Sequence, residues 1–327
     1  MTKPVCFIYT PKFLNYRLAE GHPLNPLRLQ MTYEMLNKQG LLSPPRVEVV
    51  EPRSATEAEI LTSHEAAYIH ILNRLNRNEN VPEIDHFGLG PGDTPAFPGI
   101  LDAALLYCGG SLTAAEKVLS GAPVAFNIAG GLHHAMRDHA SGFCVLNDAV
   151  IAIHRLLRDC TRVMYVDIDA HHGDGVQAAF YDTDRVFTIS IHESGDSLFP
   201  GTGYEDEIGT GAGRGYSVNV PLPAESGDDT YIAAFDRTVP DLLASYRPDI
   251  LVAQLGADAY VTDPLTHLRV TERGFGHVFR AIAGFGVPTV ALGGGGYDIH
   301  AVARVWTMAF AILSGQAPGT EAASSKY

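Results

Sequence analysis

The chain has 327 residues, of which 46% are hydrophobic and 18% are charged, so it can bury a large core. Its formal net charge is −14 and it has no cluster of lysine and arginine, which argues against a nucleic-acid-binding protein. No segment approaches the roughly 20 uninterrupted apolar residues of a membrane span, and the N-terminal residues lack the cleavage site of a signal peptide. We therefore expect a cytoplasmic protein with neither nucleic-acid nor membrane partners.

The four cysteines lie far apart along the chain, without the paired spacing of a zinc ribbon or a disulfide framework. They are Cys6, Cys108, Cys144 and Cys160. We expect all four to be reduced thiols in the core of a cytoplasmic protein.

Short apolar segments rich in β-branched residues alternate along the chain with longer segments of helical apolar spacing. The predicted strands span residues 5–10, 124–129, 163–169, 186–192, 249–258 and 287–295. The predicted helices span residues 147–159, 228–246 and 272–286. Asn147 and Asp228 are predicted N-caps, and Gly286 is a predicted C-terminal stop. Residues 40–100 are richer in proline and glycine, and we expect helices and loops that lie over one end of the sheet.

Near-continuous apolar strands between helices are typical of a parallel sheet that is covered on both faces. No repeat or low-complexity linker interrupts the chain, so we predict a single α/β domain over residues 1–327. In such sheets, ligands bind beyond the carboxyl ends of the strands. Four predicted strands run into polar clusters at that end, which are GGLHH (130–134), AHHGD (170–174), AD (257–258) and GGYD (295–298).

The segment VDIDAHHGDG (166–175) places Asp167, Asp169 and His171 on one face of an extended chain. Two close carboxylates repel each other unless a cation lies between them or one is protonated, and an imidazole completes a ligand set for zinc or another divalent metal. A hydrated loop or an ion pair is the alternative. Asp258 favours the metal, because an unpartnered aspartate at the end of so apolar a strand would carry a large desolvation cost. A metal bound by Asp169, His171 and Asp258 removes both difficulties.

The adjacent histidines His133 and His134 follow another predicted strand. Three roles are open for this pair: metal ligands, surface residues or a proton-transfer pair. The last requires that each histidine donate a ring N–H to a carboxylate. Asp167 and Asp174 are available as those carboxylates, since the predicted metal site needs neither.

The segment LGGGGYD (292–298) lacks the spacing of a dinucleotide-binding loop and the lysine of a Walker loop. Four glycines before Tyr297 instead indicate a backbone that passes close to a ligand while presenting a phenol, with a structural tyrosine as the alternative. His139 and His172 have no evident role, and we expect both in solvated loops.

These residues and their neighbours resemble the zinc-dependent histone deacetylase superfamily, and within it the bacterial acetoin-utilisation deacetylases related to the class I enzymes. The resemblance covers nearly the whole chain, with the matching segments in the family's order. They are HPLNPLRL (22–29), GLGPGDTPAFPGI (88–100), GGLHHAMRDHASGFCVLND (130–148), DIDAHHGDGVQ (167–177), FPGTG (199–203), GADAYVTDPL (256–265) and GGGGYD (293–298).

The resemblance implies the arginase/deacetylase fold, a three-layer α/β/α architecture with a mainly parallel central sheet. It also implies one catalytic Zn²⁺ per chain, with Fe²⁺ as the alternative, held by Asp169, His171 and Asp258. A structural K⁺ would lie near the zinc and involve Asp167, Asp169, His171 and Ser190.

The resemblance further implies a catalytic apparatus for amide hydrolysis. His133 and His134 would be the acid/base pair, backed by Asp167 and Asp174. Tyr297 would donate a hydrogen bond to the developing oxyanion.

Five more residues would bind the substrate, according to the same resemblance. Phe143 and Phe199 would flank a narrow tunnel for an acyl-lysine side chain, with Gly142 and Leu265 also lining it. Asp93 would lie at the rim and accept hydrogen bonds from the backbone of a peptide substrate.

The expected activity is therefore the hydrolytic removal of acetyl or other short acyl groups from lysine side chains of proteins or peptides. Acetylated polyamines or other small amides are the alternative substrates, and a non-catalytic acyl-lysine binding protein is a further alternative. A two-metal ureohydrolase is disfavoured, because it needs a second carboxylate where this chain has Tyr260. Leu132 stands where many relatives carry an aromatic residue, a departure that bears on the choice of substrate.

Overall fold

Eight parallel strands form one sheet in the computed structural model, which describes residues 3–82 and 84–317. The strands are β1 (Val5–Ile8), β2 (Val47–Val50), β3 (Val124–Asn127), β4 (Val163–Asp167), β5 (Val186–Glu193), β6 (Ser217–Leu222), β7 (Ile250–Gln254) and β8 (Thr289–Leu292). Their order is β2-β1-β3-β8-β7-β4-β5-β6, and all neighbouring pairs are parallel. The predicted parallel sheet is confirmed.

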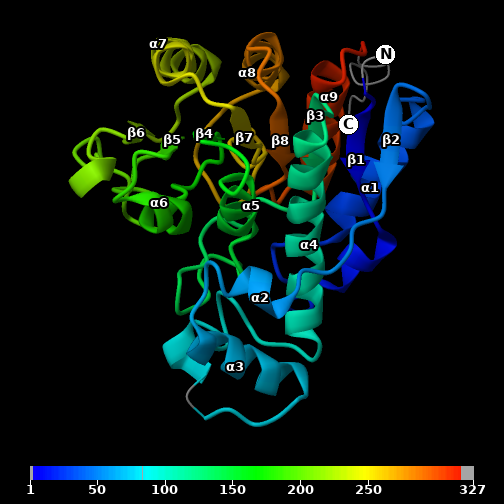
Figure 1. The fold of residues 1–327 in the computed structure, drawn as a ribbon, viewed down its shortest axis with the longest axis vertical. Coiled ribbons are helices and arrows are strands. Elements are labelled where there is room, and N and C mark those ends of the chain that lie inside the picture. The colour runs from blue at the N-terminus through cyan, green and yellow to red at the C-terminus, as the bar shows by residue number, and fades with distance from the viewer. Residues whose placement is uncertain (1–2, 83, 318–327) are drawn as a thin grey trace.

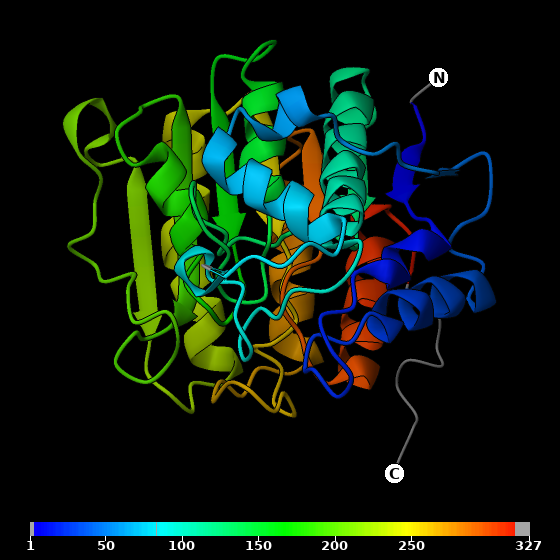
Figure 2. The ribbon, with the colours of Figure 1, turned by 90° about the horizontal axis from the view of Figure 1, so that it is seen from below.

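Helices cover both faces of this sheet and give the predicted three layers (Figure 1). The α-helices of the described residues are α1 (Leu27–Lys38), α2 (Glu57–Ile60), α3 (Ala66–Asn76), α4 (Ile100–Leu119), α5 (Asp148–Leu156), α6 (Asp174–Phe180), α7 (Asp228–Tyr246), α8 (Glu272–Gly284) and α9 (Ile299–Leu313). α7, α8 and α9 lie on one face, and α4, α5 and α6 lie on the other. α1 packs beside α9, as Figure 2 also shows.

Each face of the sheet has its own apolar core. In β4, Met164 and Val166 pack into one core, whereas Val163 and Tyr165 pack into the other. This alternation follows from the two-residue period of a strand. Burial on both sides explains why the strands read as continuous apolar runs rather than as alternating ones.

Five of the six predicted strands are shorter than predicted, whereas β5 extends one residue further, to Glu193. At the ends of three of the shortened strands, polar side chains replace the bonds of the sheet. The side-chain oxygens of Asn127, Asp167 and Gln254 each accept the backbone N–H of the residue two positions further on. A local bond of this kind competes with the hydrogen-bond ladder and turns the chain out of the sheet. The segments beyond these residues therefore form loops, and these loops carry the site residues.

The predicted helix signals are partly confirmed. The Asn147 side chain caps α5 by accepting the N–H of Val150, and Gly286 follows α8 with a φ of 67°. The Asp228 prediction is wrong: Gly227 is the N-cap of α7, and Asp228 is its first residue. The Asp228 carboxylate instead accepts the N–H groups of Thr271 and Gly274 at the start of α8, so it ties the two helices together.

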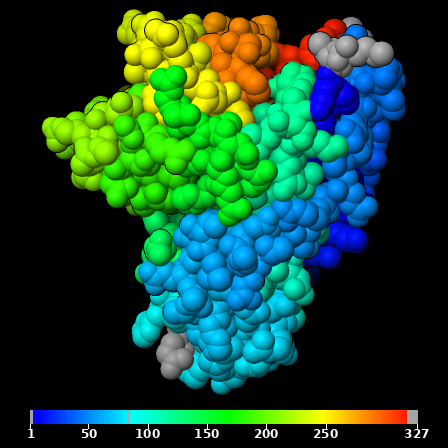
Figure 3. Space-filling model, viewed as in Figure 1, coloured from blue at the N-terminus to red at the C-terminus, as the bar shows by residue number. Residues whose placement is uncertain are grey.

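The prediction for residues 40–100 is partly confirmed, because Asp93 and Thr94 bond the loop that follows β3 at the carboxyl end of the sheet. The rest of this range differs: it contributes an edge strand, β2, and places α2 and α3 outside the α4–α5 layer, where they form the lower part of the surface in Figure 3. Tyr68 of α3 donates to the carbonyl oxygen of Val145 at 2.8 Å, and Glu65 N donates to that of Arg137 at 2.8 Å. These helices therefore support the loop that follows β3.

None of the helices in the described part of the chain is long and apolar enough to cross a membrane. The cysteines are free thiols, as predicted: Cys6, Cys108 and Cys144 are buried and Cys160 is half-buried.

Candidate metal centre and catalytic site

The four strands that run into polar clusters are neighbours at the centre of the sheet, in the order β3-β8-β7-β4. Because all four are parallel, the loops that follow them leave at the same edge, and Figure 2 shows these loops gathering at one end of the sheet. The structure thus brings together four clusters that are spread over residues 130–298 of the sequence.

Asp169, His171 and Asp258 form a buried group that could hold a metal ion, with their ligand atoms all within 4.8 Å of one another. His171 Nδ1 lies 2.9 Å from Asp258 Oδ2 and 3.1 Å from Asp169 Oδ1. The Gly295 N–H donates to Asp169 Oδ2 at 2.7 Å. A Cβ at Gly295 would lie only 2.0 Å from Asp258 Oδ2, so the glycine-rich segment is needed for this close approach.

The electrostatics of this group favour a positive charge at its centre. Burial, together with the charge of Asp169, raises the pKa of Asp258 to about 8. Burial lowers the pKa of His171, but its hydrogen bonds to Asp169 and Asp258 outweigh that effect and raise the pKa to about 10. Two buried carboxylates, together with an imidazole whose proton a metal ion would replace, make up a donor set for a divalent ion.

The predicted cause of this convergence, the alternation of side chains along a strand, is wrong. β4 ends at Asp167, so Asp169 and His171 lie beyond the strand. Beyond it, Asp167 Oδ1 accepts the N–H of Asp169, and Asp169 Oδ1 accepts the N–H of His171. These consecutive side-chain-to-backbone bonds bend the chain and turn Asp169 and His171 towards Asp258.

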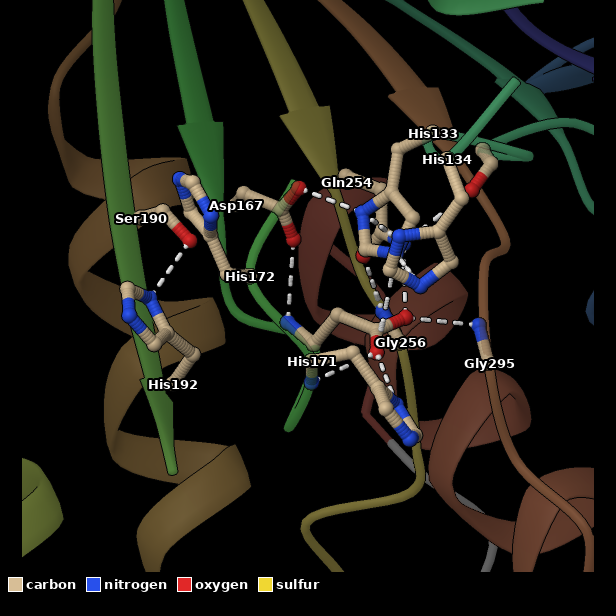
Figure 4. Close-up of polar contacts among 12 residues, drawn as sticks. His133, His134, Asp167, His171, His172, Ser190, His192, Gln254, Gly256 and Gly295 are labelled. Atoms are coloured by element: carbon tan, nitrogen blue, oxygen red, sulfur yellow. Dashed lines mark hydrogen bonds and ion pairs between the residues drawn. The ribbon is translucent and has the colours of Figure 1, made fainter. Parts of the chain in front are cut away.

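His133 and His134 lie beside this group and face each other, with their Nε2 atoms 3.1 Å apart (Figure 4). His133 Nδ1 lies 2.7 Å from Asp167 Oδ2, and His134 Nδ1 lies 2.7 Å from Asp174 Oδ1. Because a carboxylate only accepts, both Nδ1 atoms carry hydrogen and both Nε2 atoms are left for proton exchange.

One proton is shared unequally by these two buried rings. Burial lowers the pKa of His133, but the charges of Asp167 and Asp169 outweigh it and raise the pKa to about 9. The pKa of His134 is lowered by burial and then by the charge of His133. At neutral pH the pair therefore holds a charged His133 and a neutral His134, which is an acid beside a base.

Tyr297 follows the glycine segment and lies at the other side of the group, its ring 6.2 Å from that of His171. Its backbone N–H donates to Asp263 Oδ2 at 2.8 Å, which anchors it. Burial, with the charges of Asp258 and Asp169, raises its pKa well above the usual value. The phenol therefore stays protonated and can donate a hydrogen bond.

Three of the predicted tunnel residues, Phe199, Phe143 and Gly142, lie around the same place. The Phe199 ring lies 5.1 Å from that of His134, and the Phe143 ring lies 5.7 Å from that of Tyr297. Gly142 has a φ of 53°, and a Cβ there would lie 2.3 Å from His134 Cδ2. Only glycine lets the backbone pass so close to that imidazole.

Asp93, the predicted rim residue, is exposed, and one of its carboxylate oxygens already has partners. Its Oδ2 atom accepts the Gly142 N–H at 2.8 Å and the Thr94 hydroxyl at 3.2 Å. The carboxylate thus ties its loop to the loop that covers His134.

Ser190 lies opposite Asp167 in the register of β4 and β5, so the proposed K⁺ residues are neighbours. Its hydroxyl lies 2.8 Å from His192 Nδ1, a contact that Figure 4 shows.

Several buried residues that hold the site together were missed from the sequence. Gln254 Nε2 donates to Asp169 Oδ2 at 2.7 Å and to the carbonyl oxygen of Gly131 at 3.2 Å. Asp148 accepts the backbone N–H groups of Gly131 and Leu132. Gln254 lies within a predicted strand and Asp148 within a predicted helix. The only sequence signal of their role is a polar residue among apolar neighbours.

Asn147 has a second role besides capping α5. Its amide donates to the carbonyl oxygens of His133 at 3.0 Å and Ala135 at 3.1 Å. Its backbone N–H in turn donates to His64 Nε2 at 3.0 Å. A chain of hydrogen bonds therefore fixes the backbone that presents His133.

The prediction for His172 is wrong. This residue is 1% exposed, and its ring nitrogens lie 2.8 Å from Thr202 Oγ1 and 3.1 Å from Gln177 Oε1. Its polar sequence neighbours predict a solvated loop, whereas in the structure Asp169 and His171 are themselves buried in the site. The His139 side chain is 43% exposed, in agreement with its prediction.

Tyr260 donates to Glu272 Oε1 at 2.6 Å, at a position where a two-metal site would need a carboxylate. Within residues 3–82 and 84–317, Asp169, His171 and Asp258 are the one group of three such side chains with metal-ligand spacing. In the described part of the chain, the geometry therefore offers one candidate site for a divalent metal ion.

Three comparisons with known proteins agree with this geometry. Residues 22–313 match the histone deacetylase domain family. The chain is 42% identical over 324 residues to the acetoin utilization protein AcuC of Bacillus subtilis (96% of this chain, 83% of AcuC). It is 42% identical over 307 residues to histone deacetylase B of Dictyostelium discoideum (93% and 72%). The crystal structure of an HDAC homolog from Aquifex aeolicus superimposes with a TM-score of 0.90 at 35% identity, covering 96% of this chain and 85% of that one.

Proposed function

The chain belongs to the histone deacetylase family, and from that membership and the site we propose that it removes acetyl or other short acyl groups from lysine side chains of proteins or peptides. The observation that carries this proposal is the buried Asp169–His171–Asp258 group beside two histidines that differ in protonation. Amide hydrolysis near neutral pH needs a polarised carbonyl, a base for water and an acid for the leaving amine.

Asp169, His171 and Asp258 would hold one divalent ion, Zn²⁺ or alternatively Fe²⁺. When bound, the ion supplies Lewis acidity toward the acyl carbonyl and the attacking water. Gln254 positions Asp169 by donating to its second oxygen, so Asp169 is oriented before any ion arrives.

His134 is the base that takes the proton from the attacking water, because it is the neutral member of the pair. Asp174 holds its Nδ1 atom, which leaves Nε2 for the transfer. His133, which Asp167 keeps protonated, can deliver a proton to the departing lysine nitrogen. Since the two rings are coupled, the proton can pass between them through their Nε2 atoms.

Tyr297 donates its phenolic hydrogen to the oxygen that becomes negatively charged. Gly142, Phe143, Phe199 and Leu265 form the walls along which the acyl-lysine side chain reaches that point. His134→Ala should abolish most turnover while metal content stays unchanged, because His134 is not among the three proposed ligands.

A structural K⁺ at Asp167, Asp169, His171 and Ser190 is part of the proposal. The strand register that sets Ser190 opposite Asp167 supports it. Ser190→Ala should then weaken the stabilisation of the protein by K⁺ relative to that by choline chloride at equal ionic strength, measured as the unfolding midpoint.

The test is a panel of substrates assayed with the purified, metal-loaded protein. Acyl-lysine peptides of one sequence, an acetylated polyamine and a free acetylated amine would be compared by kcat/KM. The proposal expects the peptides to be turned over best. Binding without release of acetate would identify a non-catalytic acyl-lysine binding protein instead.

Deacetylation of small amides is the second candidate, and the contacts of Asp93 favour it. One carboxylate oxygen is already engaged with Gly142, so only the other is available for a peptide backbone. Asp93→Ala should lower kcat/KM on peptides about ten- to a hundredfold if it grips the peptide, since a hydrogen bond to a charged acceptor contributes roughly 1.5–3 kcal/mol. A free acetylated amine should then be unaffected. Equal losses on both substrates would assign Asp93 to holding the loop over His134.

A further inference from the structure

Two loop segments, here called the rim segments, each carry one of the proposed tunnel residues. Residues 194–201 follow β5 and include Phe199, and residues 263–268 lie beyond β7 and include Leu265. Both adjoin the metal group. The Glu193 N–H donates to the carbonyl oxygen of Ala170, which lies between two of the proposed ligands, and the Thr266 hydroxyl donates to the carbonyl oxygen of Asp258.

Glu193, the last residue of β5, joins these two segments through its carboxylate. Its Oε1 atom accepts the Ser197 hydroxyl at 2.8 Å and lies 2.8 Å from His267 Nδ1. Its Oε2 atom accepts the His267 backbone N–H at 2.8 Å. Since the carboxylate accepts only, His267 Nδ1 must be the donor.

Because Glu193 is buried, the protein depends on these hydrogen bonds to stabilise its carboxylate. Its side chain is 0% exposed, whereas that of His267 is 54% exposed. A buried carboxylate is costly unless it is paired and hydrogen-bonded, and all three donors come from the two rim segments. Displacing either segment would leave the carboxylate with fewer partners, so the two segments are held in one relative position.

We propose that Glu193 is a positioning residue that clasps the two rim segments through Ser197 and His267, and so keeps Phe199 and Leu265 at the spacing that admits only short acyl chains. This inference rests on the proposed deacylase function and adds a determinant of acyl-chain length. Neither Glu193 nor His267 is among the proposed ligands, acid/base residues or tunnel walls.

The main test uses substitutions of His267, because its side chain is exposed and the fold can tolerate a change there. His267→Ala removes the Nδ1 donor, and His267→Asn restores it, because the amide nitrogen of asparagine can take the place of Nδ1. Glu193→Gln is the second variant at the buried end. His277→Ala is the matched control, since His277 lies 2.8 Å from Asp236 in a histidine–carboxylate pair on α8 and α7.

For each variant, kcat and KM would be measured on acetyl-lysine and butyryl-lysine peptides of one sequence. We expect His267→Ala to raise KM for the acetyl peptide with kcat within about twofold of wild type, because a misplaced wall weakens binding more than chemistry. The ratio of kcat/KM for butyryl over acetyl should rise about fivefold or more, in line with the value of one or two methylenes in a pocket. His267→Asn and His277→Ala should keep the wild-type values.

Amide hydrogen exchange of residues 194–201 and 263–268 is the readout that does not need activity. Exchange should accelerate in both segments in His267→Ala and Glu193→Gln, and in neither for His277→Ala. Wild-type exchange and selectivity in both clasp variants, or a failure of His267→Asn to restore them, would overturn the proposal. If the wild-type protein releases no acetate, the proposed function fails, while the exchange data still decide whether the clasp exists.

Discussion

The proposed role of Tyr297 is confined to the transition state, because its phenol stays protonated and its ring lies 6.2 Å from that of His171. Tyr297→Phe should leave folding and metal content intact and lower kcat by at least about 10²-fold, as expected for the loss of one oxyanion donor. Steady-state kinetics on an acetyl-lysine peptide would measure this. Tyr260→Phe is the control, since the Tyr260 hydroxyl bonds Glu272 instead. Wild-type turnover in Tyr297→Phe would remove the phenol from the mechanism.

The buried imidazole of His64 should make the free energy of unfolding depend on pH. Burial lowers its pKa to about 4, so the folded protein keeps this ring neutral while the unfolded chain binds a proton near pH 6.5. The stability that depends on the neutral ring is complete above pH 6.5 and is lost as the pH falls towards 4. For this group alone the loss between pH 7 and pH 5 is about 2 kcal/mol.

His64→Gln tests that dependence, because its side-chain oxygen can still accept the Asn147 N–H but cannot titrate. Urea unfolding at pH 7 and pH 5 should show a smaller loss of stability in the variant than in wild type. An equal loss in both proteins would contradict a buried neutral His64.

Single residues were predictable from the sequence where burial without a partner would carry a large desolvation cost. Asp258 ends an apolar strand, which demands a partner for its charge, and Asp169 and His171 supply a ligand set with it. His172 and Gln254 were not predictable in this way. A polar residue in a polar segment, or one amide in an apolar strand, has the same local pattern whether it is buried in a network or solvated.

At the scale of single elements, central strands were recognised and edge strands were not. β2 has only four residues and includes Glu48, and β6 contains Asn219 and Pro221, which lower strand propensity. α4 contains Gly109 and Gly110, which oppose a helix on propensity alone. A Cβ at Gly109 would lie 1.8 Å from the Arg53 carbonyl oxygen, so a tertiary contact invisible in the local pattern requires glycine there.

Asn147, at the N-terminus of α5, combines capping of the helix with support of the loop that contains His133, and the two roles can be separated. Asn147→Ser keeps a good N-cap residue but loses the amide donors to His133 and Ala135, so kcat should fall by about tenfold or more while stability changes by roughly 1 kcal/mol or less. Thr271→Ala is the matched control, because Thr271 caps α8 away from the site. It should cost about 1 kcal/mol of stability with kcat unchanged.

Circular dichroism during urea unfolding and steady-state kinetics would give both quantities for the two variants. If Asn147→Ser retained wild-type kcat, its bonds to the loop would be structural only.

For the whole molecule, the three proposed ligands come from loops after two different strands, so they meet only in the folded chain. A metal bound there should stabilise the native state by about 2.7 kcal/mol when its free concentration is 100 times the dissociation constant. Removing it with a chelator should lower the urea unfolding midpoint of wild type. Asp258→Asn should show no such difference, and an equal chelator effect in that variant would place the metal elsewhere.

The central claim, a single-metal lysine deacylase, is tested most directly by titrating metal into the chelator-treated protein. Zn²⁺ would be added in fractions of an equivalent while acetate release from an acetyl-lysine peptide is measured. We expect no turnover without metal, a linear rise and a break at one equivalent per chain. A break at two equivalents, full activity in the presence of chelator, or no acetate release with either Zn²⁺ or Fe²⁺ would contradict the account.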